Sequence, residues 1–163
     1  MLLRRKSLVS GPVLAGGELT AADILQSTRL DADVVTLSAC DIGLNRLTHG
    51  DELLGLTRAF LGAGARSLLV TLWPVHEIPT RLFMERFYKA WLGGASRATA
   101  VSEAQYYVRS IDAETLRIRL ADYGLSPSAI TDLLDLFGTM LPGRRPFDHP
   151  YYWGAFLLIG DPY

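Results

Sequence analysis

Residues 33–43 read DVVTLSACDIG and predict a strand that ends beside the only cysteine of the chain, Cys40. The run is apolar and rich in β-branched residues, as expected of a strand covered on both faces. Ser38 and Ala39 are small, so they leave room for the backbone of a substrate to approach. Two interpretations of Cys40 stay open at this point. A lone cysteine beside an apolar run is commonly core packing, whereas a thiol at the carboxyl end of a strand lies where open α/β sheets collect reactive groups.

Helix and strand patterns alternate on either side of this strand. Upstream, GGELTAADILQS predicts a helix with Thr20 as N-cap and Asp23 reaching back to it. Downstream, DELLGLTRAFLGAG predicts a helix that is capped by Asp51 and stopped by glycines. A later helix begins with Ser126 as cap and Pro127 in its first turn. The other predicted elements are a poor strand or hairpin at 2–15, a strand at 65–75, helices at 78–94 and 97–110, and a final strand at 151–160. This order predicts a layered α/β fold with a largely parallel central sheet.

The composition is that of an ordinary globular domain. The chain has 163 residues, 49% of them hydrophobic and 20% charged, with a formal net charge of −1, so it can bury a sizeable core. Without a basic run we expect no nucleic-acid partner. One cysteine excludes a disulfide framework and a four-cysteine zinc site, and no two histidines share a helix at ligand spacing, so we predict no metal and no cofactor. No apolar stretch has the length of a secretory signal or a membrane span, so we expect a cytoplasmic protein with no membrane partner.

The glycine-rich stretch GAGARS, residues 62–67, is interpreted as a helix stop. A dinucleotide-binding loop runs from a strand into a helix, whereas this stretch runs from a predicted helix into a predicted strand. The sequence therefore argues against nucleotide binding here.

A cysteine nucleophile needs a base or another means of lowering the thiol pKa, and the chain has three histidines. His49 lies before a helix, after the loop from Cys40, and is interpreted as a solvated loop residue. His76 follows LWPV at the end of the second strand, on the same rim as Cys40, and is the best base within the chain on geometry alone. His149 precedes Pro150 in a late loop, where we expect a structural role.

Several separated motifs, in order, resemble the CHAT domain, a caspase-like family related to cysteine peptidases and separase and often fused to tetratricopeptide repeats. The matching stretches are VVTLSACDIGLN, HGDELLGLTRAFLGAGARSLLVTLWPV and HPYYWGAFLLIGD. The resemblance implies a caspase-like three-layer α/β sandwich with a mostly parallel central sheet and with Cys40 as nucleophile. It implies that Trp73 lies on the same rim and that Trp73 and Asp41 belong to the substrate-binding residues. We treat residues 1–163 as a single partial domain of this kind, with a variable helical insertion at about 112–148.

The family usually carries an acidic residue just after LW-x-V-x, and Glu77 of LWPVHE occupies that position. By analogy with separase-type relatives, Glu77 would help form the pocket for a basic residue before the scissile bond, because a carboxylate suits a guanidinium. The alternative is that Glu77 only caps the following helix, since acidic residues are favoured at helix starts.

The general base is the main departure from the family pattern. In the family it is a histidine in a His-Gly motif that ends the strand before the cysteine strand, and Met1 begins after the point where that strand should lie. The pair His49–Gly50 follows the cysteine instead, so the base role is not transferred to His49. The glycine amide of the oxyanion hole is missing with the same segment, which leaves the Cys40 amide as half a hole. We therefore expect the N-terminal strand or strands of the fold to be missing.

Three hypotheses of function follow. The first is peptide-bond hydrolysis through a thioester at Cys40 when a histidine-bearing N-terminal segment complements the chain. The second is a catalytically inactive interaction or regulatory module, in which an unpaired strand edge favours partners or self-association. The third, ranked last, is an active peptidase that uses His76 as a replacement base. The expected partners are a protein or peptide substrate, a tetratricopeptide-repeat or N-terminal CHAT segment, and a second copy of the chain in a homo-oligomer.

Overall fold

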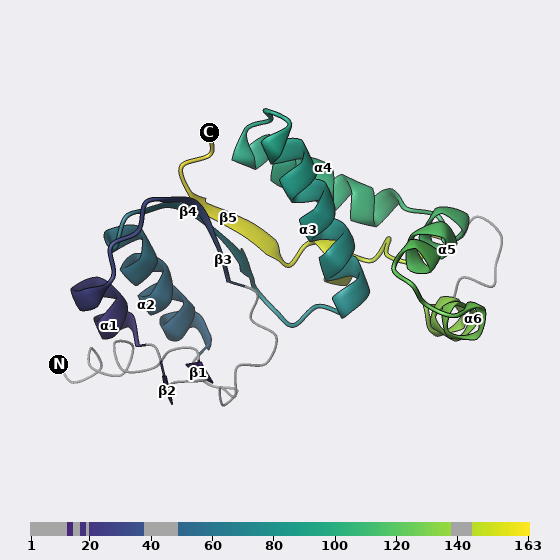
Figure 1. Cartoon of the computed structure of the whole chain (residues 1–163), viewed down its shortest axis with the longest axis horizontal. Coiled ribbons are helices and arrows are strands. Elements are labelled where there is room, and N and C mark those ends of the chain that lie inside the picture. Colours follow the sequence, from purple (N-terminus) through teal and green to yellow (C-terminus); the bar gives the residue numbers. More distant parts are fainter. Residues whose placement is uncertain (1–12, 15–16, 19, 38–48, 138–144) are drawn as a thin grey trace. The chain divides into compact units, whose positions relative to one another are not determined.

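The computed structural model describes residues 13–14, 17–18, 20–37, 49–137 and 145–163 (Figure 1). The chain divides into two compact units, which are Met1–Pro74 with Phe156–Tyr163, and Val75–Ala155. The mixture of helices with a sheet is the α/β class that the sequence predicts, and it is consistent with part of a caspase-like fold.

The first unit contains a three-stranded sheet in the order β3–β4–β5. Strands β3 (Ala32–Leu37) and β4 (Ala65–Thr71) pair in parallel, and β5 (Phe156–Gly160) pairs antiparallel with β4. The sheet is therefore mixed, with one parallel and one antiparallel pair among the described strands. Six of the seven β4 residues are buried, because β4 lies between the other two strands. Most of β3 is only half-buried, although the sequence predicts a strand that is covered on both faces. The strand that is almost wholly buried is β4.

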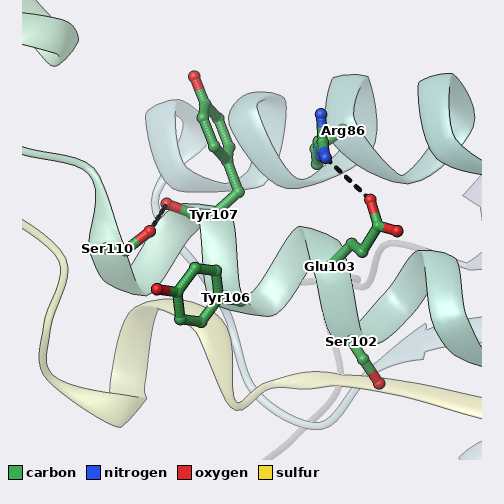
Figure 2. A pocket seen from close by; sticks show the side chains of 6 residues that line it. All are labelled: Arg86, Ser102, Glu103, Tyr106, Tyr107 and Ser110. Carbon is green, nitrogen blue, oxygen red and sulfur yellow. Dashed lines mark hydrogen bonds and ion pairs between the residues drawn. The ribbon is translucent and has the colours of Figure 1, made fainter.

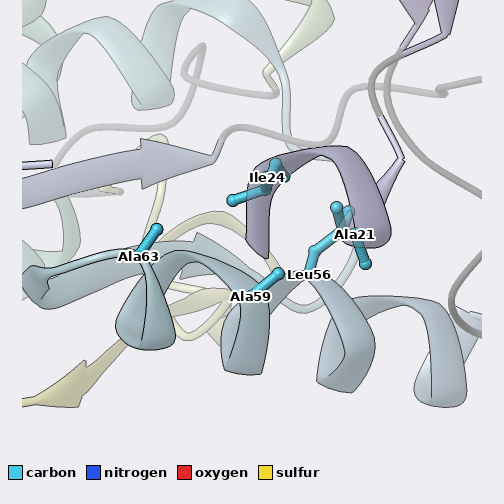
Figure 3. Close-up of a cluster of buried hydrophobic side chains, with 5 residues drawn as sticks. All are labelled: Ala21, Ile24, Leu56, Ala59 and Ala63. Atoms are coloured by element: carbon cyan, nitrogen blue, oxygen red, sulfur yellow. The ribbon is translucent and has the colours of Figure 1, made fainter. Parts of the chain in front are cut away.

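Two helices of the first unit pack against each other through small side chains. Helix α1 (Ala21–Ser27) begins with the predicted capping box, in which Thr20 and Asp23 exchange side-chain and backbone hydrogen bonds. Its buried face meets α2 (His49–Gly62). The cluster between them is shown in Figure 3 and consists of Ala21, Ile24, Leu56, Ala59 and Ala63. Three alanines let the two helix backbones approach closely, which explains how a helix as short as α1 is held.

The structure confirms the predicted end of α2 but not its predicted N-cap. The helix begins at His49, so the prediction that Asp51 caps it is wrong: Asp51 is the third helical residue. An acidic residue is favoured at the N-cap and in the first turn alike, so the residue type does not distinguish the two positions. The end is as predicted, because α2 stops at Gly62 and Gly64 has a φ of 113°, a conformation that side chains rarely adopt. Near the N-terminus, the two-residue strands β1 (Val13–Leu14) and β2 (Gly17–Glu18) pair antiparallel.

The second unit is helical. Helices α3 (Glu77–Leu92) and α4 (Arg97–Ser110) lie side by side (Figure 1). The α3 side bears fully buried Phe83 and Phe87, whose rings stack with centroids 6.3 Å apart. The α4 side has small buried residues such as Ala100 and Ala104, and small side chains allow packed helices to approach each other closely. No helix in the described part of the chain is both long and apolar enough to cross a bilayer.

The region 112–148 contains two well-defined helices. Helix α6 (Pro127–Leu136) begins as predicted, with Ser126 accepting a hydrogen bond from the Ala129 amide and proline in the first turn. Helix α5 (Ala113–Asp122) was not predicted as a separate element. Its signals are Asp112, which accepts from the Thr115 amide as N-cap, and the buried pair Leu116 and Leu120 at helical spacing.

The predicted final strand at 151–160 is half wrong. Its aliphatic half is β5, whereas its aromatic half forms the short helix α7 (Pro150–Trp153). The His149 imidazole accepts a hydrogen bond from the Tyr151 amide through Nδ1 at 3.1 Å, and Gly154 closes the turn. Proline after a capping residue favours a helix start more strongly than tyrosine and tryptophan favour a strand.

Candidate functional site

Two strand ends meet at one edge of the sheet in the first unit. Leu37, the last residue of β3, is in register with Val70 of β4, so the chain leaves both parallel strands at the same edge. Trp73 follows two residues after the end of β4 and is half-buried. Cys40 and Asp41 lie outside the described residues, so their roles stay predictions. The structure thus describes the strand that leads to the cysteine loop and the neighbouring strand end.

Glu77 is the first residue of α3, in the second unit. The N-cap position belongs to His76, whose side chain makes no capping hydrogen bond. Glu77 is therefore not the cap itself, although a carboxylate in the first turn interacts favourably with the helix dipole. Its side chain is exposed, and it lines a cleft of about 320 Å³. Both interpretations of Glu77, helix-start residue and binding residue, are compatible with this position.

This cleft, called here the apolar cleft, is formed by the first turns of α3 together with α5, α6 and the turn between them. Its polar lining consists of His76, Glu77, Arg81 and Tyr123. Its apolar lining consists of Ile78, Leu120, Leu125, Leu133, Leu136 and Phe137. A volume of this size lies at the lower end of the range for ligand pockets, roughly 300–1,000 Å³. Sequence reasoning assigned Glu77 to a binding pocket but did not bring α5 and α6 beside it.

A polar cluster on one side of the apolar cleft joins α3 to α5. Glu85 accepts hydrogen bonds from the Tyr123 hydroxyl at 2.9 Å and from Arg81 Nε at 3.1 Å, and it forms an ion pair with Arg119. The Arg81 guanidinium carbon lies 3.5 Å from the centre of the Tyr123 ring. Every charge of the cluster is thus matched by an opposite charge or an aromatic ring.

This geometry shifts two pKa values in opposite directions. Partial burial raises the pKa of Glu85, but the hydrogen bonds from Tyr123 and Arg81 and the charge of Arg119 outweigh burial, so the pKa is lowered. The pKa of Tyr123 is raised, first by burial and then by its hydrogen bond to the Glu85 carboxylate. The cluster is therefore most stable with Glu85 ionised and Tyr123 neutral.

The described histidines occupy defined structural positions. His76 lies against three aromatic rings, with centroid distances of 6.0 Å to Phe137, 6.4 Å to Tyr151 and 6.1 Å to Tyr152. His149 is the N-cap of α7, as its predicted structural role requires. His49 is the first residue of α2 rather than a loop residue.

A second concave surface lies between α3 and α4, as Figure 2 shows. Its volume is about 450 Å³. An ion pair of 2.8 Å between Arg86 of α3 and Glu103 of α4 spans it, and the exposed Tyr106 stands at its edge. Because Arg86 and Glu103 pair with each other, the described lining of this surface carries no net charge.

Comparisons with known proteins agree with the motif pattern. Tetratricopeptide repeat protein 28 of Mus musculus is 33% identical over 156 residues, which cover 96% of this chain and 5% of that protein. Tetratricopeptide repeat protein 28 of Homo sapiens is 31% identical over the same length and shares. The chain thus spans only a small part of these relatives, and no solved structure matches it significantly. The family model described as "CHAT domain" matches residues 2–161, so the chain belongs to the CHAT domain family.

Proposed function

We propose that this chain is the cysteine-bearing part of a CHAT peptidase, and that it cleaves peptide bonds through Cys40 when another segment supplies the histidine. The observation that carries the proposal is the parallel pairing of Leu37 with Val70. Cys40 is the third residue after Leu37, so the chain between their Cα atoms spans about 11 Å at most. This reach supports a thiol near the strand edge from which Trp73 also emerges, where α/β sheets bind their ligands.

The proposed reaction has two steps. The Cys40 thiolate attacks the carbonyl carbon of the scissile bond, and the amine product leaves with a proton from the histidinium, which forms a thioester. Water then attacks the thioester with the histidine as base, which releases the carboxylic acid and restores the thiol. Amide donors, including that of Cys40, would stabilise the oxyanion in both steps.

The positions of His76 and His149 support another source for the base. His149 already uses Nδ1 as a helix cap, and the exposed His76 ring lies beside three aromatic rings. Recruiting either would disturb these contacts. Since the similar proteins are named for tetratricopeptide repeats, we further propose that a repeat-bearing segment is a partner of this domain.

We also propose that Glu77 selects a basic residue before the scissile bond. Its exposed carboxylate has no hydrogen-bond or ion-pair partner among the residues that the structure describes. A guanidinium or ammonium group would supply that partner.

The test adds a strand ending in His-Gly, in trans or as an upstream extension, and follows cleavage of fluorogenic peptides. We expect cleavage after arginine that needs both pieces and is lost in Cys40→Ala. A peptidyl acyloxymethyl ketone with arginine at its reactive end should label the complemented wild type but not Cys40→Ala. Absence of both cleavage and labelling in the complemented protein would refute the proposal and favour the non-catalytic interaction module.

A further inference from the structure

The apolar cleft has two features that are typical of a ligand-binding site, an exposed apolar lining and a charged side chain. Six of its described lining residues have apolar side chains, and Leu136 among them is 71% exposed. At the same cleft stands the exposed carboxylate of Glu77. A single exposed leucine on a protein surface is common and needs no explanation. An apolar concave surface with a charged residue at its rim is typical of a binding site.

The charges around the cleft favour one sign of ligand. Among the described lining residues Arg81 is the one lysine or arginine, and it is paired with Glu85 and lies over the Tyr123 ring. Arg119, which lies nearby on α5, forms ion pairs with Glu85 and Asp122. Glu77 is left without a partner in the described part of the chain. The described lining therefore presents the negative charge of Glu77 beside apolar side chains, and a ligand that complements it is cationic on one side and apolar on the other.

The size of the cleft limits how much of a ligand it can hold. A volume of about 320 Å³ is at the lower end of the range for ligand pockets, which suits one or two side chains of a peptide. An extended peptide can place one side chain among Leu133, Leu136 and Phe137 and a nearby basic side chain at Glu77.

We propose that the apolar cleft binds a peptide segment in which a lysine or arginine lies next to a large aliphatic or aromatic residue. The basic side chain pairs with Glu77, and the apolar side chain enters between α3 and α6. As a substrate class, this proposal rests on the proposed function. Binding itself needs neither Cys40 nor an added histidine.

The experiment measures fluorescence anisotropy of four labelled peptides on the full chain carrying Cys40→Ala. The peptides differ only in two adjacent positions, which are Leu-Arg, Ala-Arg, Leu-Gln and Ala-Gln. We expect Leu-Arg to bind best and each single replacement to weaken binding about tenfold, as loss of one buried group in a pocket does. The arginine contribution should also fall with ionic strength.

Matched variants assign the two contributions to the cleft. Leu136→Ala should weaken binding of Leu-Arg but leave Ala-Arg unchanged, whereas Leu92→Ala, which alters a leucine 78% exposed outside the cleft, should change neither. Glu77→Gln should abolish the preference for arginine over glutamine. Glu114→Gln removes an exposed first-turn carboxylate of α5 and should leave that preference intact. The four residues replaced in these variants, Glu77, Leu92, Glu114 and Leu136, are exposed, so folding is expected to survive and circular dichroism checks it.

The outcomes separate the two proposals. Equal binding of all four peptides, or equal effects of Leu136→Ala and Leu92→Ala, would overturn the assignment of the cleft. Cleft-dependent binding without cleavage by the complemented wild type would support the assignment of the cleft while refuting the cysteine chemistry. Cleavage that is the same with Leu136→Ala, and the same for peptides with Leu-Arg or Ala-Arg, would support the cysteine chemistry while refuting the assignment of the cleft.

Discussion

Replacing Gly64 with alanine tests how the turn between α2 and β4 is built. Gly64 has a φ of 113°, and a Cβ atom there would lie 2.2 Å from the carbonyl oxygen of Leu30. The same Leu30 donates its amide to the carbonyl of Ala63 at 2.7 Å. The backbone before β3 and the end of α2 are thus held in contact at a point where only glycine fits.

The expected cost has two parts. An alanine with positive φ costs about 1–2 kcal/mol, of which the lower entropy of the unfolded chain recovers about 0.4–1 kcal/mol. Moving the Leu30 carbonyl away from the new methyl group strains its amide hydrogen bond to Ala63, and losing a buried backbone bond costs about 1–3 kcal/mol. We expect Gly64→Ala to lower the free energy of unfolding by about 2–4 kcal/mol, which corresponds to a decrease in Tm of roughly 6–12 °C.

Chemical denaturation followed by far-ultraviolet circular dichroism measures this difference. Gly94→Ala is the matched control, because Gly94 has a φ of 99° and a Cβ atom there would meet nothing within 4 Å. The control should cost about 1 kcal/mol or less. If Gly64→Ala and Gly94→Ala lower the free energy of unfolding equally, the close approach of Gly64 to Leu30 adds nothing to the cost, and the reasoning about this turn is wrong.

Three further predictions concern the core, a cap and the polar cluster. Phe87→Ala should cost about 3–5 kcal/mol of unfolding free energy, because the ring is fully buried; a cost under about 1 kcal/mol would contradict that packing. Thr20→Ala removes the side-chain cap of α1, with an expected cost of about 1 kcal/mol in the same assay. Tyr123→Phe removes the hydrogen bond to Glu85 and should cost about 1 kcal/mol at neutral pH, whereas Tyr106→Phe on the exposed face should cost almost nothing. The folded-state pKa of Glu85 is lowered, so the ionised carboxylate contributes fully to folding stability above its unfolded-state pKa. This stability is lost as pH falls through the folded-state pKa. The stability difference between wild type and Tyr123→Phe should therefore shrink below about pH 4.

Local signals in the sequence determined where several elements begin and end. The capping pair Thr20 and Asp23 predicted the start of α1, and Ser126 with Pro127 predicted that of α6. These motifs work because the hydrogen bonds that they form join residues two or three positions apart. The same locality explains the failures: at α2 an aspartate fits both the N-cap and the first turn, and at α7 strand-forming aromatics follow a strong helix cap.

The sequence by itself determined the α/β class, the two apolar strands that lead to the predicted site and, through its ordered motifs, the family. Only the tertiary structure decided that β5 runs antiparallel to β4, that the polar cluster joins α3 to α5, and that a cleft with Glu77 opens toward α6. Glu85 and Tyr123 are 38 residues apart in the chain, and no local pattern specifies which distant side chain a carboxylate will meet. Such contacts arise when packed helices bring their faces together, so their identity depends on the whole core and not on the residues on either side.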